Sequence, residues 1–407
     1  MNGNGFWHAD QAWLGRPARD VLIEVEDGRI KAVSEGVEPP PGATTLRGWT
    51  VPGLANVHSH AFQRVLRGRV ESGGGDFWEW RKLMYEAARR FDPDAYLRFA
   101  IGVFREMLAA GITAVGEFHY LHGHGNAMGE MLIGAARLQG IRITLIDACY
   151  LRGGLDGRPL DEAQLSFSDG DADRWAQRVD QLKEADGVRI AAAIHSVRAV
   201  DPASMRTVAE WARRRKTPLH IHLAEQPAEV EECLAAEGCT PAQLLEREGI
   251  LGPDLTSVHS IHVSEEDVKL LGDHRVAVCA CPTTERDLGD RVGPIHELTQ
   301  AGSPLCLGSD SNVVIDMFEE ARGVELDERR ASGRRVLHQP ADLFRAATAG
   351  GMRALGWDGG ELKPGLLADF ITVGDSPETL SIEDIVYCRS ARDVTNVVVG
   401  GRTVIAR

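Results

Sequence analysis

The chain has 407 residues, 43% of them hydrophobic, and its 60 acidic against 45 basic residues give a net charge of −15. This length and apolar content suit one large α/β barrel that carries a smaller annex. The acidic balance and the lack of a long basic stripe argue against nucleic acid and anionic membranes as partners.

The two ends of the chain predict β-structure of their own. Residues 21–33 alternate between apolar and other side chains and turn at Asp27 and Gly28, which is the signature of a β-hairpin. Residues 368–373 and 394–405 also predict strands and hairpins. We therefore expect both termini to join in one small β-sandwich.

Between these ends, short apolar runs recur that are bounded by polar or turn residues. Eight of them are expected to be strands, namely 50–60, 112–120, 141–150, 188–197, 218–225, 256–263, 275–284 and 304–312. Helical periodicity separates most of these runs, as at 94–108, where Gly111 follows as a C-cap. A further helix is expected at 341–355.

Apolar strands that alternate with helices indicate a parallel sheet covered on both sides. With eight such strands, the expected fold class is α/β, a (β/α)8 TIM barrel with a small β-sandwich domain formed by both termini. The expected barrel comprises residues 52–358, and the two parts of the sandwich comprise 1–51 and 359–407.

Polar and titratable side chains gather at the carboxyl end of nearly every expected strand. In chain order they are His58, His60, Glu117, His119, Tyr120, Asp147, Tyr150, His195, Arg198, His220, His222, Glu225, His259, His262, Thr283, Glu285 and Asp310. In barrels of this type the active site is built at the carboxyl-terminal face, from the ends of several strands. This distribution therefore predicts an enzyme.

Two histidines one residue apart, His58 and His60, are the strongest single feature. Side chains alternate along a strand, so both imidazoles lie on the same side at its carboxyl end and can bind one metal ion. Taken alone, the pair could also be two solvated histidines. His222 and Asp310 complete a set of three imidazoles and a carboxylate, which leaves one position for water. A closed barrel brings its eighth strand beside its first, so Asp310 can reach the pair.

A second histidine, His220, competes with His222 for the ligand position on the fifth strand. His222 is preferred because Glu225 follows it by three residues, so that both can reach the mouth of the barrel, whereas His220 lies deeper. The fourth strand ends in His195 and lacks a lysine, which would be expected there as a carbamate bridging two metals. We therefore expect one ion, Zn²⁺ or another divalent ion such as Fe²⁺.

Such an ion would activate water for a hydrolytic reaction. A bound zinc ion lowers the pKa of water from about 15.7 to about 7, which provides hydroxide as a nucleophile. Asp310, assisted by a hydrogen bond to His259, is expected to accept the proton, and Glu225 is expected to protonate the leaving nitrogen. The ordinary alternatives are a solvated carboxylate for Glu225 and a structural histidine for His259.

Together these residues resemble the amidohydrolase superfamily, in particular its mononuclear deaminase branch. The resemblance rests on the segments 58–60, 222–225, 308–311 and 362–369 and on His259. Longer strings resemble the formimidoylglutamate deiminases of bacterial histidine degradation, and these strings are 58–64, 77–85, 117–120, 195–200 and 220–226. The resemblance therefore covers nearly the whole chain.

The narrower resemblance implies hydrolysis of N-formimidoyl-L-glutamate to N-formyl-L-glutamate and ammonia. This substrate is a small amidine with two carboxylates. The matching positions that could form hydrogen bonds to it are Gln63, Arg81, Tyr120, His195 and Arg198. The two arginines could instead form ordinary surface ion pairs. The chain departs from the family pattern at Asn312, where a histidine often stands, and at Glu285 and Arg286.

Two other functions are weighed against this one. A deaminase of an aminated heterocycle such as guanine would use the same metal, but it needs an apolar or aromatic slot, whereas this chain offers arginines. A barrel that serves only as a scaffold is disfavoured, because every expected ligand, acid and base is present.

The chain shows no signs of export or membrane insertion. No charged segment followed by an apolar signal region begins it, and no apolar run is long enough to cross a bilayer. Of its cysteines, Cys149, Cys279, Cys281 and Cys306 fall in apolar runs as small core residues, which suits a reducing compartment. We therefore expect a soluble cytoplasmic enzyme, and the resemblance implies a homodimer.

Overall fold

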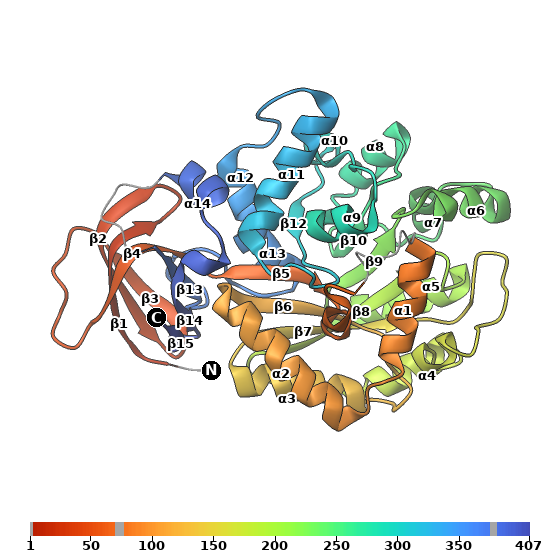
Figure 1. Cartoon of the computed structure of the whole chain (residues 1–407), viewed down its shortest axis with the longest axis horizontal. Coiled ribbons are helices and arrows are strands. Elements are labelled where there is room, and N and C mark those ends of the chain that lie inside the picture. The colour runs from red at the N-terminus through yellow and green to blue at the C-terminus, as the bar shows by residue number, and fades with distance from the viewer. Residues whose placement is uncertain (1–2, 70–76, 375–380) are drawn as a thin grey trace.

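The computed structural model describes residues 3–69, 77–374 and 381–407, and the side chains of residues 77–79 and 81 lie outside the described part. Two sheets organise the chain, one of eight strands and one of seven. In Figure 1 the eight-stranded sheet and its helices lie at the right, and the seven-stranded sheet lies at the left with both chain ends near it. This is the predicted α/β architecture, a (β/α)8 barrel with a separate β-unit built from both termini.

Eight strands form the barrel in chain order. They are β5 Leu54–Ser59, β6 Ile112–His119, β7 Arg142–Cys149, β8 Val188–Ser196, β9 Leu219–Leu223, β10 Leu255–His259, β11 Ala277–Ala280 and β12 Leu305–Leu307. Neighbouring strands pair in parallel, and nearly all their residues are buried. Each of the eight predicted apolar runs contains or overlaps one of these strands. The runs are apolar because helices cover the outer face of the barrel and side chains fill its interior, so that both faces of each strand are buried.

The barrel closes where β12 meets β5. The Asp310 amide donates to the His58 carbonyl at 2.9 Å, and the His60 amide donates to the Asp310 carbonyl at 2.9 Å. Gly308 permits this close approach, since a Cβ there would lie 2.7 Å from the Cβ of His58. The closure places the end of the eighth strand against the His-x-His segment of the first.

Helices connect the strands and cover most of the outside of the barrel (Figure 1). They are α1 Phe77–Ala88, α2 Pro93–Ala109, α3 Ala127–Gln139, α4 Ala172–Val179, α5 Pro202–Arg215, α6 Pro227–Glu237, α7 Pro241–Arg247, α8 Glu265–Asp273, α9 Pro282–Leu288, α10 Ile295–Ala301, α11 Met317–Ser332, α12 Pro340–Arg345, α13 Gly351–Ala354 and α14 Ile382–Cys388. The predicted helix at 94–108 corresponds to α2. It begins where Asp92 accepts the Ala95 amide at 2.7 Å and Pro93 takes the first turn.

The helix predicted at 341–355 is interrupted by a wider turn. α12 ends at Arg345, Ala346–Gly350 form a π-helical turn, and α13 follows. This turn packs against β5 and β12, where a Cβ on Gly351 would lie 2.8 Å from the Ala55 side chain and one on Gly350 would lie 2.7 Å from the Leu305 carbonyl. The paired glycines therefore let the turn pass close to the first and last strands.

Strands from both chain ends are hydrogen-bonded into one sheet of order β15-β14-β13-β4-β1-β2-β3. They are β1 Gly5–Trp13, β2 Pro17–Glu26, β3 Arg29–Ser34, β4 Thr44–Pro52, β13 Phe370–Val373, β14 Val394–Val399 and β15 Arg402–Ala406. The predicted hairpin is β2 and β3, with Asp27 and Gly28 both at positive φ in the turn. β4 joins the two halves, because it pairs in parallel with β1 and antiparallel with β13.

A buried ion pair connects this sheet to the barrel. Asp369 accepts hydrogen bonds from Arg142 Nε at 2.6 Å and Nη2 at 3.0 Å, and it also accepts the Gly400 amide at 2.7 Å. The two side chains are 2% and 1% exposed. Both charges lose the stabilisation that water gives them. The attraction between the two charges offsets this desolvation cost.

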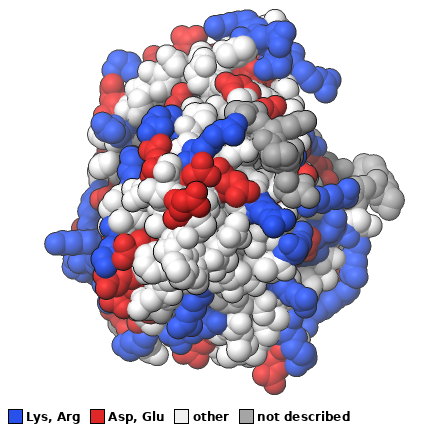
Figure 2. All heavy atoms as spheres, turned by 90° about the vertical axis from the view of Figure 1, so that its left-hand side faces the viewer, with Lys and Arg blue, Asp and Glu red and all other residues white. Residues whose placement is uncertain are grey.

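The surface carries charges of both signs. On the face toward the terminal sheet, Figure 2 shows Lys and Arg interspersed with Asp and Glu around a patch of uncharged residues. Among the residues that the structure describes, no helix has the length and apolar character needed to cross a bilayer.

Candidate active site

A pocket opens at the carboxyl ends of the barrel strands. It is lined by His60, Gln63, Trp80, Met84, Tyr85, Tyr120, Tyr150, Phe167, His195, Arg198, His222, Glu225, His259, Leu288 and Asp310. Titratable and aromatic side chains therefore line the pocket together. Arg198 is the one arginine or lysine among these lining residues.

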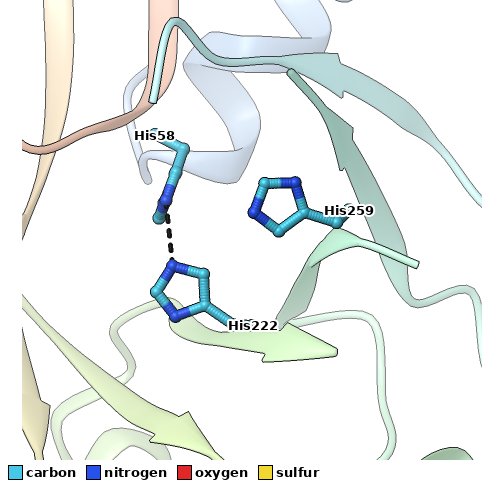
Figure 3. A group of neighbouring side chains, drawn as sticks. All are labelled: His58, His222 and His259. Atoms are coloured by element: carbon cyan, nitrogen blue, oxygen red, sulfur yellow. Dashed lines mark hydrogen bonds between the residues drawn. The ribbon is translucent and has the colours of Figure 1, made fainter. Parts of the chain in front are cut away.

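The four predicted metal ligands fall in two groups that share His58: His58, His60 and Asp310 form one, and His58, His222 and His259 form the other. Nε2 of His58 and Nε2 of His60 each lie 3.4 Å from Oδ1 of Asp310. His222 lies beside His58 in the latter group, with its Nε2 3.2 Å from Nε2 of His58 (Figure 3). Three imidazole nitrogens and a carboxylate oxygen that converge in this way can hold a divalent ion and leave a position for water.

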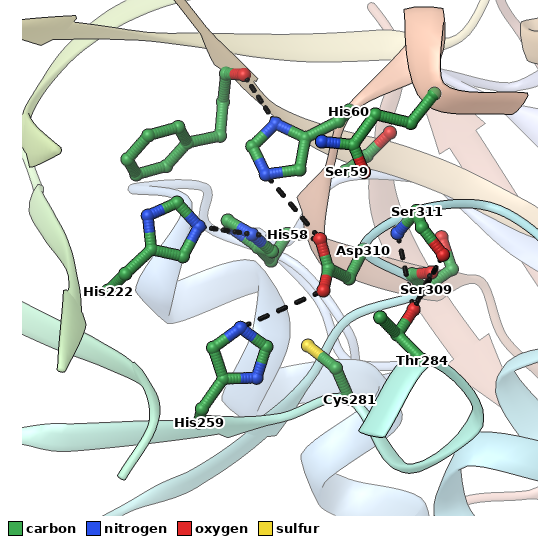
Figure 4. A network of polar contacts seen from close by, with 12 residues as sticks. His58, Ser59, His60, His222, His259, Cys281, Thr284, Ser309, Asp310 and Ser311 are labelled. Atoms are coloured by element: carbon green, nitrogen blue, oxygen red, sulfur yellow. Dashed lines mark hydrogen bonds and ion pairs between the residues drawn. The ribbon is translucent and has the colours of Figure 1, made fainter. Parts of the chain in front are cut away.

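Backbone carbonyls orient two of these rings. Nδ1 of His60 donates to the Phe118 carbonyl at 2.9 Å, and Nδ1 of His222 donates to the His195 carbonyl at 2.9 Å, which leaves both Nε2 atoms directed at the cluster (Figure 4). Burial lowers the pKa of His60 to about 3 and also lowers that of His222. Neutral imidazoles are the form that binds metals.

The carboxylate of Asp310 stays ionised in this setting. Burial opposes its ionisation, but the hydrogen bond and charge of His58, together with His259 and His60, outweigh burial and lower its pKa. The site therefore combines an anionic carboxylate oxygen with imidazole nitrogens, which suits a cation.

The structure separates His222 from its competitor His220. Nε2 of His220 faces the Ala354 carbonyl at 3.2 Å, deeper in the barrel, and burial lowers the pKa of His220 to about 3. The groups of possible ligands include His222 but not His220. We attribute this to their order along β9, since only the later residue reaches the carboxyl end.

Backbone strain is concentrated at these strand ends. Ala224, His259, Ser260, Asp310 and Asn312 all have positive φ, between 47° and 71°. Each conformation is costly for a residue with a Cβ and persists only where the surroundings impose it. Two of these residues, His259 and Asp310, line the pocket.

The expected acid and base face each other across His259. Its Nε2 lies 3.7 Å from Oδ2 of Asp310 and 3.8 Å from Oε1 of Glu225, and its Nδ1 lies 3.2 Å from Oε1 of Glu285. Burial alone would lower the pKa of His259, but Glu225 and Glu285 outweigh it and raise that pKa. Burial also raises the pKa of Glu225, which favours its protonated form.

Glu229 is a site residue that the sequence did not single out. Its Oε2 accepts Nε of Arg198 at 2.7 Å, and its Oε1 accepts the amide of Ala224 at 2.8 Å. Arg198 also approaches Oε2 of Glu225 at 3.9 Å. No local signal distinguishes Glu229 from the solvated glutamates of α6, because its partners come from other strands.

The other predicted substrate-binding residues divide into two groups. Gln63, Tyr120 and His195 line the pocket, and Nε2 of Gln63 donates to the Tyr120 hydroxyl at 3.1 Å. Arg81 belongs to α1, but its side chain lies outside the described residues.

Two buried polar residues hold the segments that carry the predicted metal ligands. Glu117 accepts the Ser59 hydroxyl at 2.8 Å and the Ala61 amide at 2.6 Å, so it holds the backbone on both sides of His60. Asn312 donates to the His60 and Asp310 carbonyls, each at 3.1 Å. The unusual residue at position 312 therefore ties the first strand to the eighth rather than lining the pocket.

A second group with metal-like spacing comprises His119, His122 and Asp147. Arg178 donates to both oxygens of Asp147 at 2.7 and 2.9 Å, and Trp175 donates to one of them at 2.9 Å. Since these donors occupy the carboxylate, we interpret this group as a buried ion network and not as a metal site.

Comparisons with known proteins agree with this geometry. The model of the amidohydrolase family matches residues 49–404. Formimidoylglutamate deiminase of Pseudomonas aeruginosa is 34% identical, covering 95% of this chain and 91% of that protein. The 8-oxoguanine deaminase of the same organism is 32% identical and covers 85% of this chain and 80% of its own. An amidohydrolase structure from Brucella melitensis matches with a TM-score of 0.92 and 32% identity, covering 99% of this chain and 95% of that one.

Proposed function

The chain belongs to the amidohydrolase family of metal-dependent hydrolases, and within it we propose that the protein hydrolyses N-formimidoyl-L-glutamate to N-formyl-L-glutamate and ammonia. The observation that carries the proposal is the convergence of a metal-ligand set, an acid and a basic carboxylate in one pocket beside Arg198. The similarity to formimidoylglutamate deiminase over 95% of the chain supports this choice of substrate.

The donor set fits one divalent ion, for which we propose Zn²⁺. Nε2 of His58 and Nε2 of His222 face each other at 3.2 Å beside the Asp310 carboxylate. These two nitrogens can share one N–H···N hydrogen bond, whereas a shared cation would bind the lone pairs of both. When bound, the ion would acidify water and so supply the nucleophile near neutral pH.

Side chains of the protein then transfer the protons. Oδ2 of Asp310 accepts the proton of the attacking water, and His259, 3.7 Å away, stabilises the carboxylate in this role. Burial raises the pKa of Glu225, which favours its protonated form, and in that form it delivers a proton to the imino nitrogen of the substrate. Asp310 returns the proton of water to the same nitrogen, the C–N bond breaks and ammonia leaves. The carbon keeps the oxygen of water as a carbonyl, and the hydroxyl proton passes to Glu225, which restores its protonated form.

The substrate carboxylates need cationic or donor partners at the pocket. Arg198 lines the pocket and is held by Glu229 at 2.7 Å, so its remaining N–H groups can bind a carboxylate. We propose Gln63, Tyr120 and His195 as neutral partners and Arg81 as a second cation. If they bind ground and transition states equally, replacing Arg198 raises KM more than it lowers kcat.

A direct comparison of substrates tests the proposal. Ammonia release from N-formimidoyl-L-glutamate would be measured beside release from 8-oxoguanine, guanine and 5-methylthioadenosine with the zinc-loaded protein. We expect the largest kcat/KM for the formimidoyl compound and N-formylglutamate as its product. A larger kcat/KM for any of the heterocycles rejects the proposal.

A heterocycle deaminase is the second candidate, and one observation favours it. Trp80, Tyr85, Tyr120, Tyr150 and Phe167 all line the pocket, which offers flat apolar surfaces to a planar ring. The 32% identity to an 8-oxoguanine deaminase agrees with this alternative. The same metal, acid and base would serve both reactions, so the substrate comparison above decides between them.

A further inference from the structure

A second set of donor atoms lies beside the four-ligand cluster. His259, Cys281 and Asp310 each offer one ligand atom, and these atoms lie within 4.8 Å of one another (Figure 4). All three residues are buried. The Cys281 thiol has no part in the proposed reaction, so its place in this group calls for an explanation of its own.

The carboxylate of Asp310 faces both sets. Its Oδ1 lies 3.4 Å from Nε2 of His58 and of His60, whereas its Oδ2 lies 3.7 Å from Nε2 of His259. A carboxylate with one oxygen on each side can bridge two ions, as in sites where two metals lie about 3.5–4 Å apart.

Glu285 contacts both His259 and Cys281. Its Oε1 lies 3.2 Å from Nδ1 of His259 and accepts the Cys281 amide at 2.9 Å. The contact to Nδ1 leaves Nε2 of His259 as the available donor, directed toward Asp310. A carboxylate on the far nitrogen of a histidine is the usual support of a metal ligand.

We propose that His259, Cys281 and Asp310 form an inhibitory subsite for a soft or borderline divalent ion, such as excess Zn²⁺ or Cd²⁺. The thiolate selects such ions over Mg²⁺ or Ca²⁺, and three protein ligands with one water complete a tetrahedron. On binding, the S–H bond of Cys281 and the N–H bond at Nε2 of His259 break, both protons pass to solvent, and metal–sulfur and metal–nitrogen bonds form.

An ion in this subsite occupies the atoms that handle protons in the proposed reaction. Nε2 of His259 and Oδ2 of Asp310 would both be ligands, so neither could serve the attacking water. Binding therefore stops turnover without displacing the first ion. The expectation of inhibition rests on the proposed function, whereas the expectation of binding does not.

Cadmium titration of the zinc-loaded protein tests the subsite. The parent protein would carry Cys239→Ser and Cys388→Ser, because these two cysteines are half-exposed and exposed and would bind cadmium themselves. We expect one equivalent of Cd²⁺ to bind with zinc retained, together with a cadmium–thiolate absorption in the ultraviolet.

Adding Cys281→Ser or Cys281→Ala to this parent should abolish the absorption and weaken cadmium binding at least about 10-fold, since even the loss of a partner behind a ligand costs about that much. The matched control is Cys306→Ser, which removes another buried thiol, on β12, from outside the group. It should bind cadmium as the parent does.

Equal absorption and affinity in the parent and in both Cys281 variants would overturn the proposal, and so would cadmium binding only in exchange for zinc. Inhibition of ammonia release should follow cadmium binding in the parent and require at least about 10-fold more cadmium in the Cys281 variants. If cadmium binds as expected but no formimidoyl substrate is turned over, the subsite stands and the proposed function fails.

Discussion

Replacing Glu229 by glutamine tests how the pocket is held in shape. Glu229 is fully buried on α6, and its carboxylate binds Nε of Arg198 at 2.7 Å and the Ala224 amide at 2.8 Å. Ala224 lies between His222 and Glu225 with a φ of 50°. One carboxylate therefore fixes both the pocket arginine and the segment that carries the acid.

The size of the effect follows from these two hydrogen bonds. Glutamine has nearly the shape of glutamate but only one acceptor oxygen, so it can serve one of the two donors. A hydrogen bond to a charged group contributes about 1.5–3 kcal/mol, and we expect Glu229→Gln to lower the free energy of unfolding by that amount. If substrate binding bears the same loss, kcat/KM falls by about 10- to 150-fold.

The pH dependence of activity should change as well. In the variant, Glu225 at 3.9 Å becomes the nearest carboxylate partner of Arg198 among the described residues. The guanidinium then stabilises the ionised form of Glu225 and lowers its pKa. Since the proposed reaction needs protonated Glu225, the alkaline limit of kcat should move to lower pH.

Steady-state kinetics across pH and urea unfolding would measure both effects. Glu231→Gln is the matched control, because Glu231 is an exposed glutamate of the same helix, and it should behave as the wild type. A Glu229→Gln variant with wild-type KM and an unshifted alkaline limit, even if less stable, would refute this reasoning.

Three further predictions concern the acid, the domain contact and a half-buried carboxyl. Glu225→Gln should keep its metal in elemental analysis but lose about 10²- to 10⁴-fold in kcat, and a full rate would reject Glu225 as the acid. Asp369→Asn should lower the free energy of unfolding by about 3–5 kcal/mol in urea, because Arg142 is left buried without its charge partner; an unchanged midpoint would contradict this. Burial raises the pKa of Asp290 from 3.8 to about 7, so its contribution to stability is complete below 3.8 and is lost as pH rises toward 7. Asp290→Asn should remove that loss, and parallel stability curves for both proteins from pH 4 to 8 would count against it.

Much of the site could be predicted from the chain because the information is local. The alternation of side chains puts His58 and His60 on one side of a strand, and the apolar runs mark where strands end. The structure then places Asp310 beside both histidines and His222 beside His58. In a closed parallel barrel the eighth strand lies beside the first, so the contact between these two strand ends follows from the fold class.

Other parts of the site had no local signal. Glu229 looks like an ordinary helix glutamate in the sequence, and the position of Glu285 at a strand end does not indicate its partner, yet each binds a residue from another strand end at the pocket. The aromatic walls also arise only when loops after several strands meet above the barrel.

The sequence by itself determined the alternation of strands and helices, the hairpins of both ends and the titratable groups at the strand ends, because periodicity and turn chemistry depend on near neighbours. Only the tertiary structure decided which carboxylates support Arg198 and His259, and that Cys281 joins His259 and Asp310 in one group. The reason is that these contacts join residues far apart in the chain, and their geometry exists only once the barrel has closed.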